Sequence, residues 1–199
     1  LNDIVLAAVT GALRQYCLER GLDPSRMKQV RAVVPVDNRS PGDVRMGSNV
    51  SSMLLDLPVD EPDLRRRVIR IYQRSQRLKD LDIADGVNLW ARFNSVIPTT
   101  LLRATSWLQF RGLMNRANLL VSNVRGPTAP LYSMGAELKE FYPYFGVQDH
   151  LGLTIVLLSY AGRLQIGVVA DPDLVPELQS LAESLPKAFY ELAHLNEMP

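Results

Sequence analysis

The clearest candidate for a chemical role in this sequence is an apolar run that ends in polar residues. It leads into Ser122 and Asn123, which bring a hydroxyl and an amide, and a Gly126-Pro127 turn follows shortly after. A rigid strand fixes the direction of the side chains at its end, so residues in this position can form a binding or catalytic site. An ordinary strand exit has the same pattern, and both interpretations are open.

Residue counts disfavour several other kinds of catalytic site. The two histidines, His150 and His194, and the single cysteine, Cys17, do not make a cluster at zinc spacing, and we predict no metal. The sequence has no Gly-x-Gly-x-x-Gly or P-loop pattern and no Gly-x-Ser-x-Gly elbow, which disfavours a self-contained triad hydrolase. His150 follows Asp149 just before an apolar segment, where a general base and a plain loop histidine are the two interpretations.

Asn2 and Asp3 stand directly before a segment of helical periodicity. Asn is a favoured helix N-cap, and Asp in the first turn interacts well with the helix dipole. We favour this capping interpretation over a catalytic one for the pair.

Hydrophobic periodicity predicts a mixed series of elements that would position these residues. Helices are expected over residues 4–16 and 62–79, and residues 96–114 are expected to form a further helical region or a pair of short helices. After an Asp171-Pro172-Asp173 cap, a final helix is expected up to about residue 194. Strands are expected over residues 31–36, 50–57, 119–124, 137–142, 153–160 and 164–170, with the last two joined as a hairpin. A polar loop over residues 37–49 separates the first two strands. This order predicts an α/β fold with a mixed sheet and helices packed on it.

The composition is that of one domain in a reducing compartment. At 199 residues and 47% hydrophobic content, the chain can bury a core, in which we expect Cys17 to pack. The net charge of +1 gives no reason to expect a nucleic acid partner. No stretch reaches the roughly eighteen apolar residues of a membrane-spanning helix, and no signal peptide is apparent. We expect a soluble or at most peripheral domain, and the first residue, Leu1, indicates a fragment.

Five sequence blocks occur in a fixed order along the chain. They are Asn2-Asp3-Ile4-Val5-Leu6-Ala7, Val33-Val34-Pro35-Val36, Met46-Gly47-Ser48-Asn49-Val50-Ser51, Val121-Ser122-Asn123-Val124-Arg125-Gly126-Pro127 and Leu157-Leu158-Ser159-Tyr160-Ala161-Gly162-Arg163-Leu164. Together they resemble the C-terminal half of the bacterial wax ester synthase/acyl-CoA:diacylglycerol acyltransferase family, over essentially the whole chain. The resemblance implies a chloramphenicol acetyltransferase-like fold with residues 1–199 as its second domain and a mixed, largely antiparallel sheet. It also implies a bacterial cytoplasmic location, with peripheral contact to the inner membrane or lipid inclusions as an option.

The same resemblance implies an O-acyltransferase that moves a fatty acyl group from acyl-CoA to diacylglycerol or a long-chain alcohol. Acyl-CoA would be a cosubstrate, and no permanently bound cofactor is expected. The family's His-His-x-x-x-Asp-Gly motif, whose histidine deprotonates the acceptor hydroxyl, belongs to the N-terminal domain, and this sequence has no adjacent histidine pair. We therefore expect the isolated chain to be inactive, to need that N-terminal domain as its partner, and to self-associate through the exposed interface. The alternatives are a non-catalytic binding module on the same fold and, with a poorer fit to the blocks, a condensation-type domain of peptide synthesis.

For single residues, the resemblance implies supporting roles in the reaction. Ser122 and Asn123 are candidate hydrogen-bond donors to the oxyanion of a thioester intermediate, or else they close the strand. Arg125 stands where the family commonly has proline, which puts the shape of the turn in doubt. With Gly126 and Pro127 it is a candidate contact for coenzyme A. Asn2 and Asp3 would then form a structural motif at the domain interface.

Two basic segments have several interpretations under this resemblance. For the arginines of the helix expected over residues 62–79, a solvated surface is favoured over contact with coenzyme A phosphate or anionic lipid. Residues 96–114 mix large apolar side chains with arginine, which is typical of an interfacial membrane helix. The same residues also suit the lining of an acyl tunnel or a packed core.

Overall fold

The computed structural model describes residues 2–27, 29–37, 50–94, 112, 115–148 and 150–195. The loop expected over residues 37–49 and the helical region expected over residues 96–114 lie almost entirely outside these described residues. The described helices are α1 (Asn2–Glu19), α2 (Leu64–Asn94) and α4 (Leu178–Ala193), with a short 3-10 turn, η1 (Pro24–Arg26), after α1.

The centre of the fold is a five-stranded sheet in the order β2-β1-β3-β6-β7. Its strands are β1 (Val30–Asp37), β2 (Val50–Leu57), β3 (Leu119–Arg125), β6 (Leu153–Tyr160) and β7 (Arg163–Ala170). Two pairings, β1 with β2 and β6 with β7, are antiparallel, and β3 pairs in parallel with both β1 and β6. The expected mixed sheet is confirmed, and most of its paired residues are antiparallel, as expected. Its parallel part arises because long connections bring β3 between two strands that run in its own direction.

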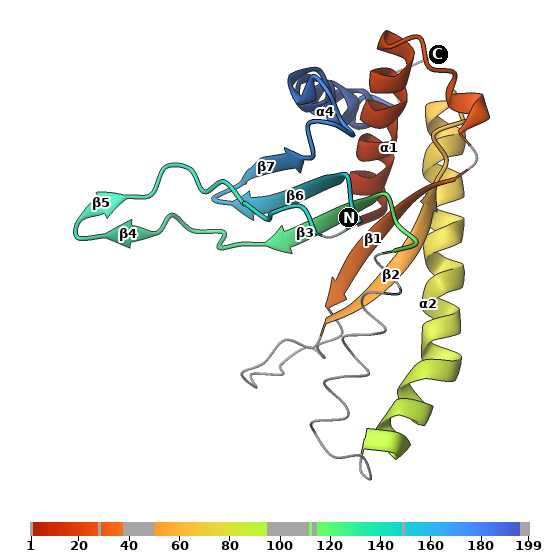
Figure 1. The fold of residues 1–199 in the computed structure, drawn as a ribbon. Coiled ribbons are helices and arrows are strands. Elements are labelled where there is room, and N and C mark those ends of the chain that lie inside the picture. Colours follow the sequence, from red (N-terminus) through yellow and green to blue (C-terminus); the bar gives the residue numbers. More distant parts are fainter. Residues whose placement is uncertain are drawn as a thin grey trace.

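Helices cover one face of this sheet (Figure 1). The main core lies on that face and joins buried side chains of α1, such as Leu6 and Val9, to Val121 of β3 and to Ile155 and Leu157 of β6. A smaller cluster lies apart from this core and contains Val33, Ala117, Leu120 and Leu151. Since side chains alternate between the faces of a strand, Leu120 and Val121 belong to different clusters.

The β6–β7 hairpin follows its sequence signal closely. Tyr160 pairs with Arg163, and the two residues between them, Ala161 and Gly162, have φ angles of 45° and 77°. Positive φ at both central residues is the mark of a type I′ turn, whose twist matches that of the flanking strands. The predicted strands over residues 31–36, 50–57 and 119–124 are confirmed as β1, β2 and β3.

Three boundaries differ from the sequence prediction. Helix α2 continues from the expected end near residue 79 to Asn94. The prediction of a strand over residues 137–142 is wrong. The strand described there is the short β5 (Ala136–Glu137), which pairs with β4 (Tyr132–Ser133). Asp171 does not cap the last helix; its carboxylate accepts a hydrogen bond from the Asp173 backbone N–H at 2.9 Å, and α4 begins at Leu178.

Cys17 lies in the core, as expected, with its side chain buried. Burial raises the pKa of its thiol, because the thiolate would lose its hydration there. The residue therefore acts as a small apolar side chain in packing.

Candidate functional site

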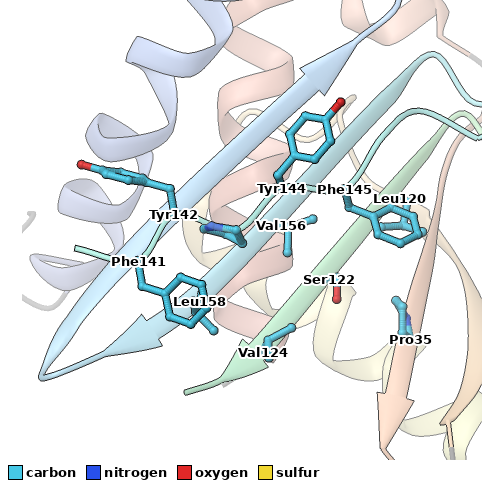
Figure 2. A pocket seen from close by; sticks show the side chains of 11 residues that line it. Pro35, Leu120, Ser122, Val124, Phe141, Tyr142, Tyr144, Phe145, Val156 and Leu158 are labelled. Atoms are coloured by element: carbon cyan, nitrogen blue, oxygen red, sulfur yellow. The ribbon is translucent and has the colours of Figure 1, made fainter. Parts of the chain in front are cut away.

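Strand β3 presents its two polar residues on opposite faces of the sheet. The side chain of Asn123 lies on the helix-covered face, where its Nδ2 donates to Oδ1 of Asn2 at 2.9 Å. Ser122 lies on the other face and lines a cavity there (Figure 2). Both residues are half-buried, in contrast to the fully buried Val121 just before them. A single small oxyanion on one face of the sheet therefore cannot contact both side chains directly.

The start of α1 is tied to two other elements by its first two side chains. Asn2 accepts the hydrogen bond from Asn123 on β3, and Asp3 Oδ1 accepts one from the Ser75 hydroxyl on α2 at 2.7 Å. Asp3 lies in the first turn of α1, as the capping interpretation expected. The hydrogen bonds of these carboxylate and amide oxygens cross to β3 and α2, so the pair holds three elements in register.

The Gly126-Pro127 turn is fastened to the β6–β7 hairpin. The Gly126 N–H donates to the carbonyl of Ser159 at 3.0 Å, and the Ala161 N–H donates to the carbonyl of Pro127, also at 3.0 Å. A Cβ atom on residue 126 would overlap the Ser159 carbonyl oxygen, so the close approach requires glycine. These bonds give the turn a defined shape although Arg125 precedes it, and Arg125 itself is exposed.

An apolar groove of about 390 Å³ lies on the face of the sheet that Ser122 shares. Strand residues such as Leu120, Val156 and Leu158 line one side, and residues 141–145 pass over the other side (Figure 2). We call residues 141–147 the strap. The strap comes close to β7 because Gly167 has no side chain there; a Cβ atom would overlap the carbonyl oxygen of Pro143. The Ser122 hydroxyl is therefore a polar group in largely apolar surroundings.

His150 lies apart from this groove. It lies just before β6, at the end of that strand where Leu153 pairs with Leu119. It lines a second cavity of about 460 Å³ together with Tyr16 and Cys17. Ser122 of β3 pairs in register with Val156, which lies further along β6. The fold therefore places His150 and Ser122 in different cavities.

His194 lies at the end of α4, with Nδ1 at 2.8 Å from the Tyr190 carbonyl and its ring tilted over the Tyr190 ring. Among the described residues, no group of three His, Cys, Asp or Glu side chains could hold a metal ion.

The arginines of α2 are largely engaged within the domain. Arg67 is buried and donates to the carbonyls of Glu61 and Pro62, each at 3.2 Å, and burial lowers the pKa of its guanidinium. Arg70 forms ion pairs with Asp60 and Glu61, and Arg74 donates to the carbonyl of Asp56 at 2.7 Å. The solvated surface favoured from the sequence is therefore wrong for buried Arg67, whereas Arg70 and Arg74 have partners but remain partly exposed.

The roles of two residues in the site region could not be predicted from the residues themselves. Ser75 stands in the middle of a helix and nothing local to it predicts a bond to Asp3. Tyr160 belongs to a recognised block, but its hydroxyl contacts were not foreseen: it accepts from the Leu131 N–H at 2.8 Å and donates to the Leu138 carbonyl at 2.7 Å. Correlated variation between distant positions in related sequences would be the signal needed to predict both sets of contacts.

Comparison with known proteins shows which proteins this chain resembles. The model of the WS/DGAT C-terminal domain matches residues 46–193. Two Mycobacterium tuberculosis proteins that bear the name diacylglycerol O-acyltransferase are 32% identical over 203 residues and 35% identical over 197 residues. The alignments cover 99% and 96% of this chain but 39% and 42% of those proteins. The chain thus spans about two fifths of the length of the curated relatives it matches.

Solved structures agree with this result. The wax ester synthase/diacylglycerol acyltransferase from Marinobacter aquaeolei VT8 superposes with a TM-score of 0.69 at 27% identity, over 98% of this chain and 43% of that one. An epimerization domain of tyrocidine synthetase B superposes with a TM-score of 0.52 at 14% identity, which shows a shared fold alone. The fold is the α/β, chloramphenicol acetyltransferase-like one with a mixed sheet. With the family model matched over most of its length, the chain belongs to the family of wax ester synthase/diacylglycerol acyltransferase C-terminal domains.

Proposed function

We propose that this chain is the second half of an acyl-CoA-dependent O-acyltransferase that transfers a fatty acyl group to diacylglycerol or a long-chain alcohol. The observation that carries the proposal is the family match over residues 46–193, together with the names of the relatives that match nearly the whole chain. Because the chain spans about two fifths of those relatives, the remaining part of the enzyme is assigned to polypeptide that precedes Leu1.

In this proposal the general base comes from the preceding half. That half would remove the proton from the acceptor hydroxyl, and the resulting oxygen nucleophile would attack the thioester carbonyl of acyl-CoA. The carbonyl oxygen then gains negative charge and must be stabilised by hydrogen-bond donors that are already in place. The carbonyl would re-form as the C–S bond breaks, and the thiolate of coenzyme A would leave and take the proton held by the base. The absence of an adjacent histidine pair in the 199 residues supports this division of roles.

Ser122 is the side chain of this half that we assign to the oxyanion. Its hydroxyl is held on a strand paired on both sides, and it faces a groove whose other lining is largely apolar. In such surroundings little water competes for the hydrogen bond, and one positioned donor contributes about 3 to 4 kcal/mol to transition-state stabilisation. The same groove is of a kind that accepts an aliphatic chain.

Asn123 is assigned a supporting role on the opposite face. Its amide is engaged with Asn2, so it would fix the position of β3 relative to α1 and thereby the position of Ser122. Arg125 is exposed at the end of β3, and with Gly126 and Pro127 it is the proposed contact for the coenzyme A part of the cosubstrate. Among the described residues, no helix is long and apolar enough to cross a membrane. We propose that the protein binds its lipid substrates through peripheral contact with a lipid surface.

The proposal is tested with the full-length protein, meaning this chain joined to the polypeptide that precedes it. Purified protein is supplied with a long-chain acyl-CoA and, in separate reactions, a long-chain alcohol or diacylglycerol. We expect release of free coenzyme A and formation of the matching ester with at least one acceptor. Release of coenzyme A without any ester product, or no release with either acceptor, would contradict the proposal.

A further inference from the structure

Two buried polar side chains on the groove side of the sheet lack a hydrogen-bond partner. Thr154 of β6 is fully buried, and Gln165 of β7 is 6% exposed. Among the described residues, none forms a hydrogen bond with Thr154 Oγ1 or with Gln165 Oε1. Burial removes the water that would otherwise bind these oxygens, so an unpaired buried polar atom costs stability. Such an atom beside a cavity is a candidate contact for a ligand.

Gln165 lies at the border of the apolar groove. It pairs directly with Leu158 of β6, which lines the groove, and directly paired residues point their side chains to the same face. Gly167 is the next residue of β7 on this face, and the strap covers it at Pro143. Thr154 is on the same face but four residues before Leu158, about 13 Å away along the strand. The two unpaired groups are therefore separate positions, and Gln165 is the one beside the groove.

Gln165 shares its face of the sheet with Ser122, the proposed donor to the thioester oxyanion. Ser122 pairs with Val156, whereas Gln165 pairs with Leu158, two residues further along β6. With a rise of about 3.3 Å per residue and about 4.8 Å between strands, the backbones of Ser122 and Gln165 are about 12 Å apart. The pantetheine arm of acyl-CoA extends away from the thioester and carries two secondary amides. A thioester held at Ser122 can therefore bring one of these amides to Gln165.

A secondary amide matches the hydrogen-bonding capacity of the Gln165 side chain. The side-chain amide has one acceptor oxygen, Oε1, and two N–H donors on Nε2. The N–H of a secondary amide can donate to Oε1, and its carbonyl can accept from Nε2. An aliphatic chain in the same place would leave Oε1 unpaired. The pantetheine arm is therefore better suited to this position than the fatty acyl chain.

The strap passes over β7 on this face (Figure 2). Among the described residues, no backbone hydrogen bond joins residues 141–147 to a strand of the sheet. Packing holds the strap instead, as where Phe141 meets the Tyr160 ring edge-on with 6.3 Å between ring centroids. A shift of the strap breaks no such backbone hydrogen bond, and it would admit a ligand to the amide of Gln165.

We propose that Gln165 binds a secondary amide in the pantetheine arm of acyl-CoA. Its Nε2 donates to the amide carbonyl of the cosubstrate, and its Oε1 accepts from the amide N–H. This inference deepens the proposed function and rests on it, because acyl-CoA is the cosubstrate of that reaction. Gln165 is a positioning residue that holds the arm with its thioester near Ser122 and takes no part in bond making or breaking.

The test compares two acyl donors in the full-length protein, with an acceptor that the parent protein esterifies. One donor is a long-chain acyl-CoA, and the other is the S-ethyl thioester of the same fatty acid, which has no pantetheine amide. Gln165→Leu keeps the approximate size of the side chain and removes both hydrogen-bonding atoms. It should lower kcat/KM for acyl-CoA by about 10-fold to 100-fold, chiefly through a higher KM, and change the value for the ethyl thioester by less than about three-fold. Equal falls for both donors, or an unchanged kcat/KM for acyl-CoA, would overturn the inference.

Thr154→Val is the matched control, because it removes the other unpaired oxygen on this face of the sheet. It should leave kcat/KM for acyl-CoA within about three-fold of the parent value. A fall equal to that of Gln165→Leu would contradict a specific role for Gln165.

Thermal unfolding without ligand separates binding from a structural role. Gln165→Leu should keep or raise the midpoint of unfolding, because an apolar group replaces a buried oxygen that has no partner. A midpoint lower by more than about 2 °C would show that the amide supports the free fold, and this result would also overturn the inference.

The outcomes distinguish this contact from the proposed function. A parent protein that forms no ester from acyl-CoA would refute the proposed function and, with it, this contact. A parent protein that forms the ester with a kcat/KM unaffected by Gln165→Leu would refute the contact alone.

Discussion

At the scale of the residue, Ser122 and Asn123 are neighbours in sequence with different proposed roles. One faces an apolar groove and the other is bonded to Asn2 across the helix-covered face. Their substitutions should therefore affect the enzyme in different ways. The difference can be measured because one role concerns the reacting atoms and the other concerns the placement of a strand.

Ser122→Ala in the full-length protein should lower kcat by about 100-fold to 1,000-fold with a small change in KM, because the lost donor acts mainly on the transition state. Steady-state kinetics with acyl-CoA and a long-chain alcohol measure this effect. The control is Ser133→Ala, which removes an exposed hydroxyl from the arm, meaning residues 128–140 with the paired strands β4 and β5, and should leave both constants unchanged. A kcat within a few-fold of the parent for Ser122→Ala would remove the oxyanion assignment and leave the family membership unaffected.

Asn123→Ala and Asn2→Ala should each destabilise the protein by about 1 kcal/mol, because each removes one partner of the same hydrogen bond. The double variant should cost clearly less than the sum of the two single variants, since the second substitution has no bond left to break. Urea unfolding of the four proteins measures this coupling. Strictly additive free energies would show that the two side chains do not depend on each other.

Gly126→Ala should be more damaging than its size suggests. The added methyl group would meet the backbone carbonyl of Ser159, which cannot move without disturbing β6, and we expect a loss of about 1 to 3 kcal/mol in unfolding free energy. Gly146→Ala is the matched control, because its nearest neighbour would be the Tyr144 hydroxyl at 4.0 Å. Equal stability of the two variants would contradict the close approach of the turn to β6.

At the scale of the element, Tyr160 decides how the arm joins the sheet. Tyr160→Phe keeps the buried ring and its edge-to-face contact with Phe141 but leaves the Leu131 N–H and the Leu138 carbonyl without the hydroxyl between them. We expect faster hydrogen exchange at the Leu131 amide, with little change in β1 and β2. Tyr190→Phe on α4 provides the control, and unchanged exchange at Leu131 would show that the phenol does not hold the arm.

Element positions were predictable wherever a local pattern fixes the local structure. The apolar runs and turn residues of β1, β2, β3 and the β6–β7 hairpin predicted their bounds to within a few residues. The arm was missed because its shape depends on a tyrosine more than twenty residues away in sequence and not on local periodicity. Long α2 was underestimated because its later residues depart from the apolar pattern of its first turns.

The candidate site was only partly predictable for the same reason. Sequence blocks pointed to Ser122, Asn123 and Gly126, but adjacency in a strand means opposite faces, and this separates the first two. The bond between Asn2 and Asn123 joins two blocks that are 121 positions apart. No local property of either residue indicates such a pair.

At the scale of the whole molecule, helices cover one face of the sheet, and the face that Ser122 shares has no helix over it among the described residues. The helices α1 and α4 pack against each other and help to enclose the main core, while the face with Ser122 carries a groove and a strap. The exposed apolar arm extends beyond the end of the sheet (Figure 1). An isolated 199-residue chain would expose these surfaces to water, and we propose that it self-associates when the preceding half is absent.

We propose that this chain is one half of an acyltransferase whose general base lies on the other half. The most direct measurement compares ester formation from acyl-CoA and a long-chain alcohol by the isolated 199-residue chain and by the full-length protein, at equal molar concentration. The claim predicts ester formation by the full-length protein and none above the uncatalysed rate by the isolated chain. Ester formation by the isolated chain at a rate comparable with that of the full-length protein would contradict it.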